Sequence, residues 1–461
     1  MLANIFYFLI VIGILVIVHE WGHYAAARAT GMRADIFSFG MGRRLFGWNK
    51  RTGFTFGSLP LDFQFDGLTD WRVCLFPIGG YVKVAGMIDE SFDNDHVIVE
   101  PKPWEFRSKN TFQKALVLSA GVIMNFILAV LIYGGIALFN GETSWETTEV
   151  AFVRDEGIAD LIGIQNGDKI ISINGKEINT WSQFLQSASM DNFGGNYEVV
   201  VNRDGETHTL NADNQKILEI LTDQSNLEKG LSDIIGAEPA NIKVFFSQIL
   251  STSPADKLGL LPGDTVIAVN GEYIVSSGQF IDIVQSSGSN IMMLKWKRGE
   301  RIINAPIKSD KENRIGVLLQ MDYTGPVFTR DFTIIESLQK GFDDSIGIIN
   351  IIFKSFGQIF KGNIEVKEAV AGPIMIAKQS GRTAELGLEY FLSFLGGLSL
   401  SLALINILPL PALDGGHLLM VIIEGIIRRE LPVKTKLIIQ NIGMILLLGL
   451  MVFIVFIDLT R

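Results

Sequence analysis

Four apolar stretches along the chain are each long enough to cross a membrane. They fall at residues 1–27, 115–139, 389–411 and 437–457. About 20 apolar residues in a helix cover the ~30 Å hydrocarbon core of a bilayer. The pattern therefore predicts a polytopic α-helical membrane protein with four transmembrane helices. The first stretch lacks a basic start and a clear cleavage site, so we interpret it as a retained helix rather than a signal peptide.

Basic residues near these helices predict their orientation. After the first helix come Arg28, Arg33, Arg43, Arg44, Lys50 and Arg51. Between the third and fourth helices come Arg428, Arg429, Lys434 and Lys436. Lysine and arginine close to membrane helices favour the cytoplasmic side, and in a four-helix layout both connections lie on one side. We therefore expect the long region between the second and third helices, and both termini, on the opposite side.

That long middle region contains a repeat. The segment GIQNGDKIISINGKEI begins at Gly163, and GLLPGDTVIAVNGEYI begins at Gly259. A recurring unit of this kind predicts two copies of one module, and its Asn-Gly pairs favour tight hairpin turns. The motif resembles PDZ domains, which implies extracytoplasmic β-sandwich modules at about 145–235 and 240–325. PDZ domains add a peptide strand to a sheet edge; the alternative, that the modules act only as spacers or gates, is equally open.

The segment between the repeat and the third helix has a helical pattern. From Glu336 to Gly362, apolar residues recur at helical spacing with polar residues between them. This pattern predicts an amphipathic helix within a helical linker at 326–388. The helix is expected either in the membrane interface or against the PDZ pair, where it would couple that pair to the membrane helices.

Composition supports a membrane protein with a substantial water-exposed part. Of 461 residues, 48% are hydrophobic and 19% are charged, which is too apolar for an ordinary soluble enzyme and too charged for a wholly embedded transporter. A net charge of −10 argues against a nucleic-acid partner. Cys74 is the single cysteine, which excludes an intrachain disulfide and thiolate metal clusters.

The candidate catalytic and metal-binding residues lie near the end of the first predicted helix. His19 and His23 are four residues apart, so on a helix both imidazoles share one face and can reach one metal ion. Glu20 lies beside them, close enough to hold a metal-bound water. This is the His-Glu-x-x-His signature of zinc hydrolases, in which the glutamate is the general base. Ionisable groups inside a membrane helix are rare and functional by default, which weakens the alternative of ordinary surface residues.

A catalytic zinc ion commonly has three protein ligands, and Asp414 is the candidate for the third. It lies in LPLPALDGGHLL, where Pro409 and Pro411 must break the third helix. The first helix reaches His19 about 27 Å from its start at 1.5 Å per residue, and the third reaches Asp414 after a similar run. Both then arrive near the cytoplasmic edge of the bilayer. A plain turn residue is the alternative for Asp414, and His417 is a rival ligand that we interpret as structural.

The chain resembles the site-2 protease family of intramembrane metalloproteases. The resemblance rests on His-Glu-x-x-His in a first helix, on NILPLPALDGG in a later one, and on two PDZ modules between them. It covers nearly the whole chain. FPIGGYVKVAGM, from Phe76, resembles the family's membrane-associated β-hairpin within the cytoplasmic-side loop at 28–114. The second-helix motif around Asn125 departs from the family, which often has Gly-Pro where this chain has Gly121-Val122. The stretch from about 53 to 73 is longer than the resemblance leads us to expect, and we assign it no role.

The resemblance implies specific roles and partners. His19, His23 and Asp414 would bind Zn²⁺, Glu20 would activate water, and Asn406 would bind substrate or an oxyanion, or simply join two helices. Substrate backbone would pair with the hairpin residues Gly79, Gly80, Tyr81, Val82 and Lys83. The implied substrates are single-span membrane proteins that have been trimmed outside, such as an anti-sigma factor, and remnant signal peptides, in the bacterial inner membrane. The PDZ pair would then act as a size filter or bind peptide ligands.

Three other functions are weighed against this one. A membrane-anchored PDZ scaffold predicts no bound zinc. A zincin that faces the aqueous phase needs a third ligand outside the membrane, where His208 stands without a partner motif. A transporter fits poorly, because four helices with one polar cluster show no inverted repeat.

Overall fold

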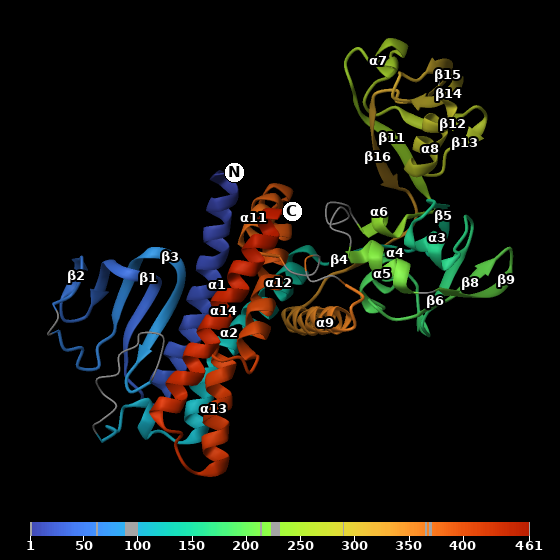
Figure 1. Cartoon of the computed structure of the whole chain (residues 1–461). Coiled ribbons are helices and arrows are strands. Elements are labelled where there is room, and N and C mark those ends of the chain that lie inside the picture. The colour runs from blue at the N-terminus through green and yellow to red at the C-terminus, as the bar shows by residue number, and fades with distance from the viewer. Residues whose placement is uncertain are drawn as a thin grey trace. The chain divides into compact units, whose positions relative to one another are not determined.

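The computed structural model describes residues 2–60, 63–87, 100–212, 214–222, 231–288, 290–364, 367 and 371–460. Part of the predicted cytoplasmic-side loop, 88–99, lies outside them. The chain divides into two compact units. The first comprises Met1–Asn140, Asp331–Ile352 and Val370–Arg461, and the second comprises Gly141–Arg330 and Phe353–Ala369. Figure 1 shows the helices of the first unit and the strand-rich modules of the second.

Four helices of the first unit are long and apolar enough to cross a membrane, among the described residues. They are α1 (Leu2–Ala29), α2 (Thr111–Asn140), α12 (Leu388–Ile407) and α14 (Val433–Thr460). α2 packs against both α1 and α12 (Figure 1). α12 ends four residues before the predicted limit of 411, with Leu408 extended, because the residue before a proline avoids the helical conformation.

Two further helices flank this bundle. α11 (Pro373–Leu386) precedes α12, and α13 (Asp414–Ile427) follows the proline-containing turn. The sequence predicted only a turn and a short basic link after Asp414, so α13 is an addition to that prediction. It ends at the basic pair, where Arg428 adopts a left-handed conformation.

A three-stranded antiparallel sheet follows α1. Its strands are β1 (Ala34–Asn49), β2 (Gly53–Phe56) and β3 (Asp70–Val84). β3 bends so that its two halves pair with the same strand: Phe37 of β1 is opposite both Trp71 and Val82. The unassigned stretch 53–73 contains β2 at its beginning and the start of β3 at its end. A buried ion pair helps hold it, since the Arg44 guanidinium donates two hydrogen bonds of 3.1 Å to Asp70 and others to the β2 hairpin.

The second unit contains two modules that correspond to the sequence repeat. The first holds β5 (Val150–Val153), α3 (Ile158–Ile162), β6 (Lys169–Ile173), β7 (Lys176–Glu177), α4 (Trp181–Gln186), β8 (Tyr197–Arg203), β9 (Glu206–Ala212), α5 (Asn214–Thr222), α6 (Leu231–Ile235) and β10 (Ala237–Pro239). The second holds β11 (Ile242–Ile249), α7 (Pro254–Leu258), β12 (Thr265–Val269), β13 (Glu272–Tyr273), α8 (Ser277–Ser287), β14 (Ile291–Arg298), β15 (Arg301–Lys308) and β16 (Val317–Tyr323). Each module has its own apolar core. β4 (Glu142–Trp145) and β17 (Val327–Arg330) pair where the chain enters and leaves this unit.

The repeated Gly-Asp of the two modules forms a buried anchor. Asp168 is completely buried and accepts hydrogen bonds of 2.7 and 2.8 Å from Arg203. Asp264 is 1% exposed and accepts bonds of 2.7 and 2.6 Å from Arg298. In both modules the pair joins a loop to the strand that runs beside it, which explains why the sequence repeats the aspartate.

The predicted amphipathic helix is α9 (Ile334–Phe360), which belongs to both units. Within the first unit it packs closely on α2, because a Cβ on Gly341 would lie 2.3 Å from the Val130 carbonyl oxygen. Within the second unit its last turns bond the first module, where the Gln358 amide donates to the Gly194 carbonyl. α9 thus contacts the first module, which is one of the two placements that the sequence left open, and it also contacts the membrane helix α2.

Candidate active site

The His-Glu-x-x-His residues lie on the last third of α1. One helical turn separates His19 from His23, and their ring centroids are 4.9 Å apart. His19 is 7% exposed. Gly22, between them, permits a close helix crossing, since a Cβ there would lie 2.3 Å from the Ala120 carbonyl oxygen of α2. The two imidazoles are therefore held inside the helix bundle.

Asp414 reaches the same point from the first turn of α13. Its Oδ2 lies 3.0 Å from His19 Nε2 and 3.3 Å from His23 Nε2. The chain can fold back so tightly because glycines follow. A Cβ on Gly415 would lie 2.3 Å from the Ile407 carbonyl oxygen, and one on Gly416 would lie 2.2 Å from that of Leu410. The structure thus brings together residues that are 395 positions apart.

The three donor atoms fit a tetrahedral metal ion. The two Nε2 atoms are 3.2 Å apart and each lies 3.0–3.3 Å from Asp414 Oδ2. Bonds of ~2.0–2.1 Å to zinc in tetrahedral geometry place neighbouring ligand atoms about 3.3 Å apart. Two imidazoles and a carboxylate are also ligand types that zinc accepts. In the described part of the chain, these three residues are the group that could hold a metal ion, and their ligand atoms all lie within 4.8 Å of one another.

Glu20 lies between the metal ligands and the sheet. The backbone N–H of Val82 in β3 donates a hydrogen bond to its carboxylate. Gly80 lies close by, since a Cβ there would be 3.3 Å from Glu20 Cγ and 2.8 Å from Val16 Cγ1. The strand is thus packed directly on the face of α1 that carries the candidate base.

A cavity of about 230 Å³ joins these groups. Its wall includes Glu20, Asn406, Asp414 and the predicted hairpin residues Gly79, Gly80, Tyr81 and Val82. Asn406 lies near the end of α12, with its Nδ2 3.4 Å from His19 Nε2. His417, the rival ligand, lines the cavity but is not part of the three-residue donor group.

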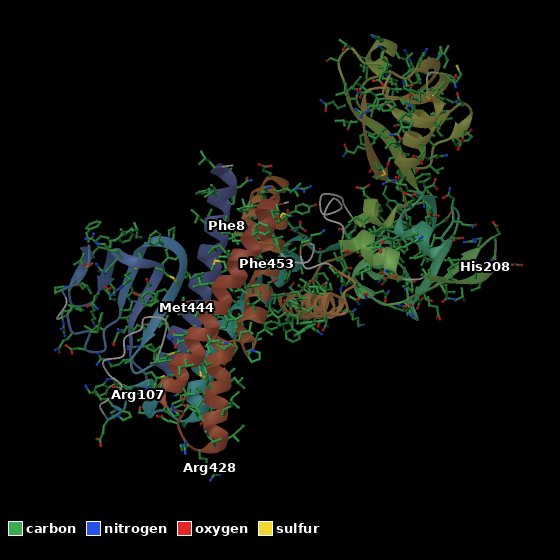
Figure 2. All side chains as sticks on the ribbon, in the orientation of Figure 1. Phe8, Arg107, His208, Arg428, Met444 and Phe453 are labelled. Carbon is green, nitrogen blue, oxygen red and sulfur yellow. The ribbon has the colours of Figure 1, made fainter. Side chains whose placement is uncertain are left out.

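The predicted hairpin residues lie in the outermost part of the three-stranded sheet. Residues 80–84 pair with β1 on one side, and no other strand of the described chain pairs with them. An edge of this kind can accept an extended peptide. His208 lies elsewhere, on β9 of the first module (Figure 2), and joins no metal-binding group within the described ranges.

α2 contributes contacts that the sequence reasoning did not include. His23 Nδ1 lies 2.8 Å from the Val117 carbonyl oxygen, and His19 Nδ1 lies 3.2 Å from the Asn125 amide nitrogen. Gly121 lies between them on the same face, and its Cβ would be 2.5 Å from His23 Nε2. For Asn125, the available sequence signal was its position one helical turn after Gly121 in an otherwise apolar helix. The Val117 contact has no sequence signal, because it uses a backbone carbonyl.

Comparisons with known proteins agree with this chemistry. The chain is 30% identical to a Pasteurella multocida protein named as a candidate zinc metalloprotease, over 98% of each chain. It is 29% identical to the regulator of sigma E protease of Haemophilus influenzae, and 26% identical to the regulator of sigma-E protease RseP of Escherichia coli, again over 98% of each chain.

A solved structure and a family model also match. The PDZ domain of an SdrC-like protein from Listeria monocytogenes is 28% identical, with a TM-score of 0.16, over 16% of this chain and 85% of that one. The model of peptidase family M50 matches residues 7–450. The chain therefore belongs to peptidase family M50 and is a metalloprotease that uses zinc.

Proposed function

We propose that this protein is an intramembrane zinc endopeptidase of the site-2 type that cleaves single-span membrane proteins within the bilayer. The observation that carries the proposal is the position of the donor group. His19 and His23 lie on a helix that is long and apolar enough to span a membrane, and Asp414 meets them from the turn after another. A hydrolytic site that binds metal at such a depth serves substrates that are themselves in the membrane.

The three donor residues hold zinc and Glu20 is the general base. When bound, zinc acts as a Lewis acid that polarises the scissile carbonyl and lowers the pKa of water to about 7. Glu20 takes the proton from the attacking water and passes it to the leaving amine. Its hydrogen bond from Val82 keeps the carboxylate aimed at the cavity. Asn406, whose amide lies at the metal-binding face, donates a hydrogen bond to the carbonyl oxygen as negative charge develops there.

The open edge of β3 presents the substrate. A helical substrate hides its peptide bonds in its own hydrogen bonds, so it must be extended before water can attack. Residues 80–84 form an outer strand next to Glu20, with no second strand of the described chain beside them, and strand addition there would hold the substrate as a strand. We assign this role to the segment from Gly79 to Lys83.

We propose that the two modules of the second unit are PDZ domains and that they have different roles toward substrates. In the second module, a cavity of about 510 Å³ separates α8 from the edge strand β16, and Phe280, Val284 and Leu319 are among its apolar wall. The corresponding strand of the first module, β10, has only three residues and ends in a proline. The second module therefore binds extended peptide, and the first acts as part of a filter against substrates that have not been trimmed.

Location and substrates follow from the same proposal. We infer that the active site lies toward the cytoplasm and the PDZ domains in the periplasm of a bacterial inner membrane, because the basic residues after α1 and α13 favour the cytoplasmic side. The names of two relatives refer to regulation of sigma-E. The substrates are then an anti-sigma factor that has been trimmed outside, and remnant signal peptides. The alternative is a PDZ scaffold without protease activity, which the intact donor group argues against.

A paired measurement on detergent-purified protein tests the proposal. Bound zinc and cleavage of a tagged signal-peptide helix are measured in the wild type and in Glu20→Gln, Asp414→Ala and His417→Asn. We expect Glu20→Gln to keep zinc and lose about 10²–10⁴-fold in cleavage rate. Asp414→Ala should lose zinc, and His417→Asn should keep it. A wild type without zinc, or cleavage that survives Glu20→Gln, would support the scaffold instead.

A further inference from the structure

Each of the two candidate ligand histidines meets a polar group of α2 through its second ring nitrogen. His23 Nδ1 lies 2.8 Å from the Val117 carbonyl oxygen. His19 Nδ1 lies 3.2 Å from the side-chain amide of Asn125. Asn125 is 0% exposed, and its Oδ1 has no hydrogen-bond partner among the described residues. An unpaired buried oxygen next to a histidine ring requires an explanation, because such a group costs about 1–3 kcal/mol.

Metal binding determines which atom of the amide should face His19. An imidazole that binds a metal ion through Nε2 carries its proton on Nδ1 and usually donates it to an oxygen. The Val117 carbonyl accepts this proton from His23. For His19, a half-turn of the Asn125 amide about its terminal bond exchanges Nδ2 with Oδ1. The oxygen then accepts the proton from His19 Nδ1, and the amide nitrogen takes the position that the oxygen left, where the described residues offer no hydrogen-bond partner.

We propose that Asn125 is a positioning residue that holds His19 in the tautomer and orientation that bind zinc. The inference rests on the proposed role of His19 as a ligand. Ser399 Oγ of α12 donates a 2.8 Å hydrogen bond to the backbone carbonyl of Asn125, which joins the two helices and does not involve the side-chain amide. α2 thus orients both histidines from one face, by a carbonyl at position 117 and by an amide two turns later.

The test uses two substitutions of Asn125 that distinguish the loss of its hydrogen-bond acceptor from a change in side-chain volume. Asn125→Asp keeps an acceptor oxygen and the size of the side chain, whereas Asn125→Leu keeps a similar size and removes the oxygen. Zinc affinity of the detergent-purified full chain is measured by competition with a chelator of known affinity. We expect Asn125→Leu to bind zinc about 10–100-fold more weakly, the usual effect of losing such a partner. Asn125→Asp should remain within about threefold of the wild type.

Ser399→Ala is the matched control, because it removes a hydrogen bond at the same helix crossing and leaves the amide in place. It should keep the zinc affinity of the wild type. If Asn125→Leu does not fold, Asn125→Ala replaces it. Equal zinc affinity in Asn125→Leu and wild type, or equal losses in Asn125→Asp and Asn125→Leu, would overturn the inference. A wild type that binds no zinc would instead overturn the proposed function.

Discussion

Gly22 of α1 and Gly121 of α2 lie at the same helix crossing, and neither has room for a methyl group. A Cβ on Gly22 would be 2.9 Å from the Gly121 nitrogen and 2.3 Å from the preceding carbonyl oxygen. A Cβ on Gly121 would be 2.5 Å from His23 Nε2 and 2.7 Å from His19 Nε2. The close approach of the two backbones is what brings the histidines against α2.

Gly121→Ala should therefore impair metal binding directly. The added methyl group would occupy the space of the two nitrogens that are the candidate ligands, so at least one ring must move. We expect zinc affinity to fall about tenfold or more, as for other disturbed ligand positions. Chelator competition on the purified protein measures it. Gly135→Ala is the control, because a Cβ at that position of α2 meets no atom within 4 Å; equal affinities in the two variants would contradict the prediction.

Gly80→Ala should reduce cleavage without loss of zinc. Its Cβ would lie 2.7 Å from the Ser38 carbonyl oxygen and 2.8 Å from Val16 Cγ1, so β3 must shift away from α1. A displacement of about 1 Å at a reacting group can cost ~10²-fold in rate. We expect kcat/KM for a tagged single-span substrate to fall by one to two orders of magnitude, about 10–100-fold. The zinc content should equal that of Gly347→Ala, a substitution at an open position, and an unchanged kcat/KM would show that the strand does not position the substrate.

Asn406→Ala separates substrate chemistry from metal binding. Its Nδ2 is 3.4 Å from His19 Nε2, beside the donor group but not a member of it. If its amide stabilises the developing oxyanion, the variant should lose about 10²–10³-fold in kcat with little change in KM. Zinc affinity should stay within a few-fold of the wild type. Steady-state kinetics together with chelator competition check both points, and a loss confined to zinc affinity or to folding would assign Asn406 a structural role.

Local patterns in the sequence predicted the site better than they predicted its surroundings. The spacing of His19 and His23 is a property of one helix, so it could be seen directly. Asp414 could be inferred only from the orientation of two helices and from a family resemblance. The α2 contacts were not inferred: the Val117 carbonyl has no sequence signature, and the motif around Asn125 did not by itself show which histidine its amide would meet. The assignment of roles to these residues stays a prediction until the variants are measured.

Single helices and strands were likewise predicted where the sequence pattern is local and missed where it is not. Four membrane helices followed from hydrophobic length, and the repeat predicted two modules with corresponding strands. β2 and α13 were missed. Arg44 donates hydrogen bonds both to the β2 hairpin and to Asp70, which lies 26 residues further along the chain. In the modules, the recurring aspartate was visible but its arginine was not, although Asp168–Arg203 and Asp264–Arg298 have nearly equal separations of 35 and 34 residues.

Those aspartate–arginine pairs predict where each module is most easily destabilised. The hydrogen bonds that Arg203 donates to Asp168 raise the pKa of the Arg203 guanidinium above its ordinary value, and those that Arg298 donates to Asp264 do the same for Arg298. Both aspartates are buried, so Asp168→Asn and Asp264→Asn leave a charged guanidinium with a weaker partner. Each should destabilise its own module by about 1–3 kcal/mol. Hydrogen exchange of the full chain measures this locally, as faster exchange in β6 and β8 for Asp168→Asn and in β12 and β14 for Asp264→Asn.

Arg314→Gln is the comparison for this last experiment. Arg314 pairs with Glu312 at 3.1 Å, but the two side chains are 71% and 70% exposed. Exposed ion pairs contribute about 0–1 kcal/mol, so exchange in β12 and β14 should barely change. If Arg314→Gln and Asp264→Asn had equal effects, the buried aspartate would not be the anchor that the repeat preserves. If Asp168→Asn accelerated exchange in both modules, the two would unfold as one cooperative unit rather than as two domains.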